Sequence, residues 1–218
     1  MKKFFLVALL LYSVAVAAQD TVTIVHQRYT TTFDKQLHYP VKVHWIVKAA
    51  DVCEKNTPGY IKRTNDYRAD AALFDATNLK LDYKSASDRY DRGHNMDAAD
   101  NSCNLAQMHE SFYFSNMTPQ TKHLNEQTWR YLEDHTRQLA KVFGKVEVWC
   151  GSYGKKEMMG RVTVPAFCWK ILKYNGTVEA YVFPNTVSVN SGPYTDYKRS
   201  ISSIRNASHL SLPDAPNF

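Results

Sequence analysis

Residues 121–143 form the one stretch of this 218-residue chain with a clear helical period. Apolar side chains recur there every three or four residues, the spacing that places them along one face of a helix. They are Leu124, Trp129, Leu132, Leu139, Val142 and Phe143. Gly144 follows where glycine commonly ends a helix. The sequence therefore predicts one long helix with a single buried face.

The segments around this helix have the composition of strands. β-Branched and aromatic residues alternate or run together through residues 21–33, 38–49 and 111–118, and again through 145–151, 161–174 and 177–185. A polar turn is expected at 34–36 and another at Asn175 and Gly176. Residues 52–87 are rich in polar and turn-forming residues, which predicts a long irregular surface segment. One long helix among such strands indicates an α+β fold with a mixed, mostly antiparallel sheet.

The first eighteen residues resemble a secretory signal peptide. Lys2 and Lys3 precede an apolar run at 4–11, and small residues follow up to position 18. The apolar run is too short for a comfortable membrane span, although an uncleaved anchor is the alternative. We expect a single domain at 19–218 that is secreted or periplasmic, has no membrane segment in its mature form, and is a monomer or a homodimer.

The interpretation of the cysteines and of the net charge depends on this expected export. Four cysteines in an oxidising compartment favour two disulfides over a metal cluster. We predict Cys53 with Cys103, and Cys150 with Cys168 because that pair falls in neighbouring strand-like segments. The formal charge of +6 suits a polyanionic partner, but many exported proteins are equally basic.

Three polar residues lie on or beside the apolar face of the predicted helix. A projection at about 100° per residue places Asn125 near the middle of that face, with Glu133 about 80° and Arg137 about 120° away. Asn125 could cap the helix, or its carbonyl oxygen could bind a hard cation such as Mg²⁺. The helical pattern alone leaves both interpretations open.

The run Asp91-Arg92-Gly93-His94 combines residues that packing alone does not require. Histidine is the usual general base near neutral pH, and the arginine guanidinium matches the geometry of phosphate oxygens. Glycine allows close approach of another backbone, and the aspartate could orient a ring or anchor the loop. A solvated charged turn is the alternative interpretation of the run.

Together with the segment SNMTPQTKHLNEQTWRYLE at 115–133, this run resembles the DNA/RNA non-specific endonucleases with a ββα-metal site. That family includes secreted bacterial nucleases and mitochondrial endonuclease G, and the resemblance extends over residues 63–185. It implies hydrolysis of DNA and RNA without sequence preference, leaving 5′-phosphate ends.

The resemblance also implies roles for individual residues. His94 would be the general base, and Asn125 would be the only direct protein ligand of Mg²⁺, for which Mn²⁺ could substitute. Glu133 would hold a water bound to that ion, while Arg92 and Arg137 would contact the phosphate. The block RTNDYRAD at 63–70 adds Arg63 as a further phosphate contact, and Asn116 and Gln120 match polar positions that line the family's cleft.

Two departures and two rival functions accompany this reading. Asp97 stands where many relatives have a small residue or proline, and Arg205 stands where they commonly have glutamate. One rival is a nucleic-acid-binding protein without catalysis. The other is a zinc hydrolase, for which the histidines lack a suitable ligand spacing; they are His94, His109, His123 and His135.

Overall fold

The centre of the molecule is a six-stranded sheet in which every neighbouring pair of strands is antiparallel. The computed structural model describes residues 20–73, 79–84, 86–186 and 192–213. Along the sheet the strands are β1 (Thr21–Val25), β2 (Tyr29–Asp34), β3 (Tyr39–Lys48), β6 (Lys145–Tyr153), β9 (Phe167–Tyr174) and β10 (Thr177–Pro184). This confirms the predicted α+β fold with a mostly antiparallel sheet. Residues 21–33, predicted as one strand, instead form β1, a turn and most of β2.

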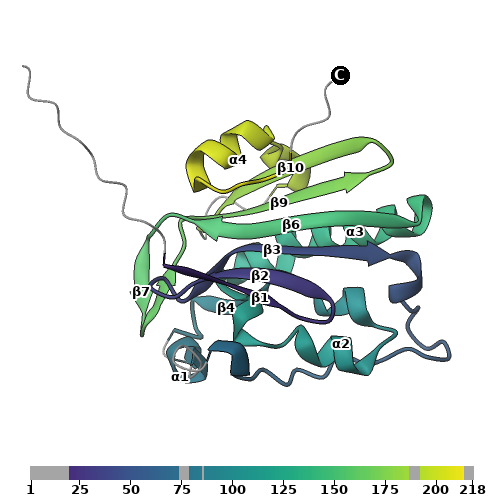
Figure 1. Cartoon of the computed structure of the whole chain (residues 1–218), viewed down its shortest axis with the longest axis horizontal. Helices are drawn as coiled ribbons and strands as arrows, with labels where there is room; N and C mark the ends of the chain where they lie inside the picture. The colour runs from purple at the N-terminus through teal and green to yellow at the C-terminus, as the bar shows by residue number, and fades with distance from the viewer. Residues whose placement is uncertain (1–19, 74–78, 85, 187–191, 214–218) are drawn as a thin grey trace, which may run out of the picture.

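Helices cover both faces of the sheet (Figure 1). The helix α3 (Arg130–Phe143) contacts β3, β6 and β9, and the short helix α4 (Ile201–Ser208) packs on the opposite face. Strand β9 shows the division, since Cys168 and Leu172 face α3 while Trp169 and Ile171 face α4.

The predicted long helix is present, but its apolar face is shorter than expected. A π-helical segment at Leu124–Trp129 leads directly into α3. Leu124, Trp129 and Leu132 are buried in the core, whereas Val142 is 72% exposed and Phe143 is 42% exposed. In the last turn of α3 the Phe143 ring still contacts Tyr174 of β9, with the centroids 5.3 Å apart, but Val142 points to solvent, so the apolar period outlasts the buried face.

A second, two-stranded sheet lies beside the first. It pairs β4 (Tyr90–His94) antiparallel with β5 (Met117–Thr121), and the π-helical segment and α3 follow β5 to complete a ββα unit. The prediction of a strand at 111–118 was wrong, because a 3₁₀ turn occupies Phe114–Asn116 and the strand begins at Met117. The remaining short elements are β7 (Glu157–Met159), β8 (Val162–Val164), α1 (Leu79–Lys84) and α2 (Leu105–Glu110).

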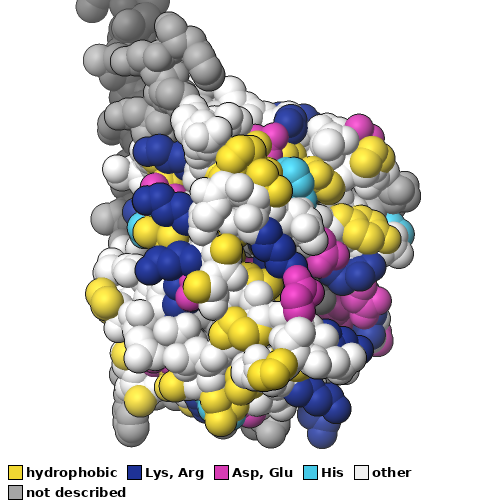
Figure 2. All heavy atoms as spheres, turned by 90° about the vertical axis from the view of Figure 1, so that its right-hand side faces the viewer, with side chains coloured by type: hydrophobic (Ala, Val, Ile, Leu, Met, Phe, Trp, Pro, Cys, Tyr) yellow, Lys and Arg dark blue, Asp and Glu magenta, His cyan; other side chains and the backbone are white. Residues whose placement is uncertain are grey.

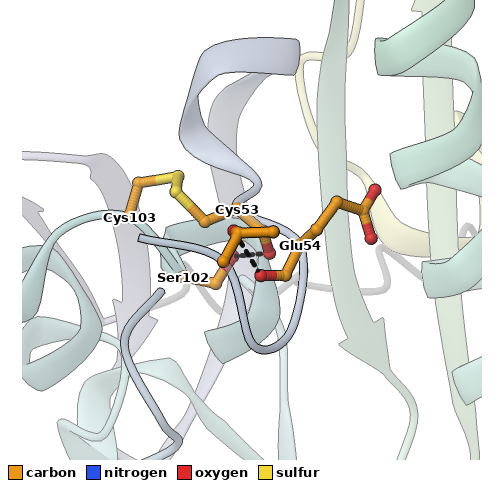
Figure 3. Close-up of a disulfide and its surroundings, with 5 residues drawn as sticks. Cys53, Glu54, Ser102 and Cys103 are labelled. Carbon is orange, nitrogen blue, oxygen red and sulfur yellow. Dashed lines mark hydrogen bonds between the residues drawn. A yellow bond between two sulfur atoms is a disulfide. The ribbon is translucent and has the colours of Figure 1, made fainter. Parts of the chain in front are cut away.

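One disulfide joins two segments that are far apart in the sequence (Figure 3). Cys53 bonds to Cys103 across 50 residues, and the Ser102 hydroxyl donates to the Cys53 carbonyl at 3.1 Å. The bridge fastens the predicted irregular segment 52–87, which also contains the short helix α1, to the connection between β4 and β5. This half of the predicted disulfide pattern is present.

The other predicted disulfide, between Cys150 and Cys168, was wrong. Both cysteines are free and buried. They do lie on neighbouring strands, but Cys150 is opposite Lys170 and Cys168 is opposite Ser152. The two cysteines are therefore diagonal neighbours, and that offset exceeds the Cα separation that a disulfide normally bridges.

The terminal segments were also subjects of prediction. The proposed signal peptide at 1–18 lies outside the described residues. Within the described part of the chain, no helix has both the length and the apolar character needed to cross a membrane. Near the other end, Arg205 of α4 donates to the carbonyls of Leu212 and Pro213, at 3.3 and 3.2 Å, and so secures the C-terminal segment.

Candidate active site

One cleft of about 930 Å³ collects most of the predicted site residues. Its walls come from the segment before α1, from β4, from the π-helical segment and from α3. Six of the eight predicted residues line it: Arg63, Arg92, His94, Asn125, Glu133 and Arg137.

His94 ends β4 with its ring deep in the cleft wall. The residue is 6% exposed, and Phe112 packs edge-on against the imidazole with the ring centroids 4.9 Å apart. Burial, reinforced by the positive charges of Arg63 and Arg92, holds the pKa of His94 well below its usual value. The ring is therefore neutral at pH 7. Its Nε2 atom is buried without a hydrogen-bond partner among the described residues, so this atom is available to accept a proton.

The side chain of Asn125 is oriented by its neighbour across the cleft. Its amide nitrogen donates to the carboxylate of Asp91 at 2.9 Å, which directs the amide oxygen away from Asp91. Amide and carboxylate oxygens are ligands that suit Mg²⁺, an ion that also retains several waters. Within the described residues no group of three or more His, Cys, Asp or Glu side chains is arranged to hold a metal. The oxygen donors that line the cleft, among them the Asn125 amide and the Asp91 and Glu133 carboxylates, suit a hard, hydrated cation.

The π-helical segment changes which residues share a face. A helix with i→i+5 hydrogen bonds has more residues per turn than an α-helix, so a projection at 100° per residue fails across it. Asn125 lies within this segment and Glu133 lies in α3, yet both line the cleft. The cap interpretation of Asn125 is not supported, because Asn125 lies inside the π-helical segment and its side-chain amide donates to Asp91 on a different element.

Glu133 has a buried lysine behind it. The Glu133 side chain is 11% exposed, and the Nζ atom of Lys170 lies 3.9 Å from its Oε1. Lys170 itself is 1% exposed and its ammonium sits 4.2 Å from the Trp129 ring centroid. Burial raises the pKa of Glu133 to about 7, and the charge of Lys170 opposes that rise. Sequence reasoning missed Lys170, although it shares the strand parity of Cys168 and Leu172, which face the core.

Arg137 reaches the cleft from α3 already paired with acids. Its guanidinium contacts Asp97 and Asp134, and lies 3.5 Å from Asp100. Asp97, the unusual residue after the histidine, is thus an ion-pair partner of Arg137, and it also caps the following 3₁₀ turn. These carboxylates offset much of the positive charge that Arg137 presents to the cleft.

The other two predicted substrate contacts lie behind the cleft. Asn116 is fully buried, and its amide bonds to the backbone of Met96 and Ser111, which fixes the chain just after His94. Gln120 is also buried, with its side chain lying against Gly93. These two residues match the family's spacing, but neither side chain lines the cleft.

Gly93 is needed for packing. A Cβ atom at this position would lie 2.2 Å from the Gln120 Oε1 atom. Gly93→Ala is expected to destabilise the fold by about 1–3 kcal/mol, the usual cost of overpacking a tight interior. Urea unfolding measures this, and Gly93→Ala combined with Gln120→Ala should recover part of the loss. Equal stability of wild type and Gly93→Ala would contradict the packing argument.

The overall positive charge is not spread as a uniform basic surface. Figure 2 shows one face on which Lys and Arg side chains are interspersed with Asp and Glu side chains and with exposed apolar groups. The cleft is similarly mixed, since Asp91, Glu126 and Asp134 line it together with the arginines. Binding of a polyanion in this cleft would therefore depend more on individual Lys or Arg side chains that lack an acidic partner than on the net charge of the chain.

Comparison with known proteins identifies the family. A model of the family described as DNA/RNA non-specific endonuclease matches residues 9–217. This chain belongs to that family. The membership agrees with the ββα unit and with the cleft built around β4 and the helix.

Several known members of the family are similar in sequence or fold. Human mitochondrial endonuclease G is 33% identical over 171 residues, which cover 68% of this chain and 56% of that protein. A nuclease of Nostoc is 32% identical over 116 residues, covering 52% of this chain and 42% of that one. The crystal structure of an EndoG/EndoGI complex contains a chain with the same fold, with a TM-score of 0.78 and 24% identity over 87% of this chain and 84% of that one. This chain spans about half the length of the mammalian relatives that it matches.

Proposed function

We propose that this chain is a Mg²⁺-dependent endonuclease that hydrolyses the backbone of DNA and RNA, with His94 as general base. The observation that carries the proposal is a buried, neutral imidazole whose Nε2 atom lacks a partner among the described residues, in the cleft that also holds Asn125 and Arg92. Membership of the non-specific endonuclease family supports it.

The reaction assigns a separate task to each side chain. A water molecule attacks the phosphorus atom while His94 Nε2 removes its proton. The bond from phosphorus to the 3′ oxygen breaks, and that oxygen takes a proton from solvent, which leaves 5′-phosphate and 3′-hydroxyl ends. Arg63 and Arg92 would bind the phosphate oxygens from the β4 side, and Arg137 would do so from α3.

The remaining cleft residues would serve a divalent cation. Asn125 would offer its amide oxygen, held in place by Asp91, and Glu133 would hold a water molecule near the ion. When bound, Mg²⁺ or Mn²⁺ would add positive charge that stabilises the phosphate in the transition state. Asn116 and Gln120 would act only by supporting β4 and the residues that follow it.

Substrate breadth follows from the type of contact. Guanidinium groups and a hard cation recognise phosphate, and phosphate contacts carry no direct sequence information. We therefore propose that both DNA and RNA are cleaved without base preference. We also propose export, because residues 1–18 have the layout of a signal peptide.

A gel assay with the purified, oxidised chain tests the proposal. We expect supercoiled plasmid, single-stranded DNA and RNA all to be cut in the presence of Mg²⁺ or Mn²⁺, and none to be cut in the presence of a chelator. Retarded but intact plasmid under every condition would instead support a catalytically silent binding protein. Cleavage that requires Zn²⁺ would support the zinc hydrolase.

A further inference from the structure

Tyr67 connects two of the predicted phosphate contacts to the histidine. The guanidinium carbon of Arg92 lies 3.9 Å from the Tyr67 ring centroid, and Arg63 donates a hydrogen bond to the Tyr67 hydroxyl at 3.2 Å. The same ring lies 5.7 Å from the His94 ring, between centroids. Arg63, Arg92 and His94 thus meet at a single aromatic side chain.

The backbone around Tyr67 is fixed by the core below it. Arg68 forms a bridge with the chain near Tyr113, through hydrogen bonds of 3.2 Å to the Phe112 carbonyl and 3.0 Å from the Phe114 amide. The Tyr67 ring then packs edge-on against Phe112 with the centroids 5.0 Å apart. Although the segment before α1 has little regular structure, the position of this ring is well defined.

Neutral side chains hold Arg63 and Arg92, and acids do not. Arg63 contacts Asn65 at 2.8 Å and the Phe112 ring at 5.0 Å, and Tyr67 is the side chain that contacts both arginines. Among the described residues, neither guanidinium has a carboxylate within 4.0 Å, whereas Arg137 has three such partners. Both are exposed, and a long exposed side chain has many rotamers to lose when it is fixed in one geometry. A ring face under Arg92 and a hydroxyl at Arg63 restrict these side chains while leaving their charges uncompensated.

We propose that Tyr67 is a positioning residue that holds Arg63 and Arg92 beside His94 in the geometry that binds a phosphate. This inference rests on the proposed nuclease function and adds a residue to its binding machinery. The alternative is that Tyr67 only fills space between the core and the cleft. The ring and the hydroxyl can be separated by mutation, which distinguishes the two roles.

The test measures nucleic-acid affinity of the full chain in chelator across a series of salt concentrations. Each phosphate contact that is lost lowers the slope of log K against log salt by about one. Tyr67→Leu, which removes both contacts, is expected to weaken binding to a short DNA duplex by roughly tenfold or more and to lower the slope by between about one and two. Tyr67→Phe keeps the stack under Arg92 but loses the hydrogen bond from Arg63, so it should lose less affinity and lower the slope by about one.

A matched control is available at Tyr113. Its ring carries Arg68 at 4.8 Å, a stack of the same kind, but it does not line the cleft. Tyr113→Leu should leave the salt slope unchanged even if stability falls. An unchanged slope in folded Tyr67→Leu, or an equal loss in Tyr113→Leu, overturns the proposal. Should Tyr67→Leu not fold, Tyr67→Phe decides, because a wild-type slope would refute the role of the hydroxyl at Arg63.

Failure of the wider function would look different. A wild-type chain that neither binds nor cuts nucleic acid would refute the proposed nuclease. If the wild-type chain cuts nucleic acid and every Tyr67 variant binds with wild-type affinity and salt slope, only the role of Tyr67 is refuted.

Discussion

His94→Ala is expected to lower the rate of plasmid nicking by about 10²- to 10⁴-fold, the contribution typical of a general base. Alanine has no atom that can remove a proton from the attacking water. Binding of DNA in chelator should change little, because Arg63 and Arg92 remain in place. The measurement is a time course of nicking under saturating substrate, combined with a binding titration.

A second histidine provides the control for this variant. His123 is partly exposed at the start of the helix and does not line the cleft, so His123→Ala should cut at nearly the wild-type rate. Nicking by His94→Ala at a rate close to wild type would remove the imidazole from the reaction.

The same substitution should alter how stability depends on pH. The pKa of His94 is well below its usual value in the folded chain, whereas in the unfolded chain it should lie near its ordinary value of about 6.5. Between those two values the unfolded state binds more protons, so His94 costs stability increasingly as the pH falls below about 6.5. Urea unfolding from pH 8 to pH 5 should therefore show a steeper loss of stability for wild type than for His94→Ala. Parallel curves would contradict the buried, neutral state of this ring.

Asn125→Ala is expected to reduce turnover by roughly 10³-fold, because metal-ion catalysis supplies several kcal/mol of transition-state stabilisation. The substitution removes the amide oxygen that we assign to the cation, and leaves Asp91 without the donor that it holds. Binding of Mn²⁺, followed by calorimetry or by electron paramagnetic resonance, should weaken in parallel with activity. This second readout does not depend on catalysis.

The neighbouring residue Gln127 tests whether the effect is specific. It lies exposed in the same π-helical segment, so Gln127→Ala changes the segment without touching the cleft. It should bind Mn²⁺ and cut DNA as wild type does. Wild-type Mn²⁺ affinity in Asn125→Ala would mean that the cation, if it is required, is held elsewhere.

Much of the architecture could be predicted because its signals are local. The turn at Asn175 and Gly176 needs left-handed backbone, which both residues adopt here, and it joins β9 to β10 as expected. The helical spacing of apolar residues at 121–143 is also a local signal, and it indicates a helix without reference to distant residues. Two short motifs, at 91–94 and 115–133, contain four of the six site residues that line the cleft, while Arg63 belongs to the block at 63–70 and Arg137 lies one helical turn after the second motif. That these residues meet in space could be expected only through the family resemblance.

The predictions from the sequence that were wrong concern properties that residues adjacent in the sequence do not determine. Whether Cys150 meets Cys168 depends on strand register, which shifts the pair by two residues from direct opposition. Whether Asn116 faces substrate or core depends on the 3₁₀ turn that replaces the predicted strand. Tyr67 gains its place in the cleft, and Lys170 its place behind Glu133, from contacts with residues distant in sequence. Strand parity could place Lys170 on the core side of β9, but it could not place it beside Glu133.

The bridge between Cys53 and Cys103 has a consequence for the order in which the cleft can be completed. The described residues between Cys53 and β4 contribute no strand to the main sheet, so sheet formation alone does not hold the segment with Arg63 and Tyr67 in place. The covalent link closes a loop of 50 residues around it and limits its freedom before it docks. In a reducing compartment this wall would rely on side-chain packing and on a few backbone hydrogen bonds, such as those of Arg68 with Phe112 and Phe114, while the sheet and α3 would keep all their own contacts. Formation of the disulfide thus affects how one wall of the cleft is assembled, whereas the main sheet and α3 form independently of it.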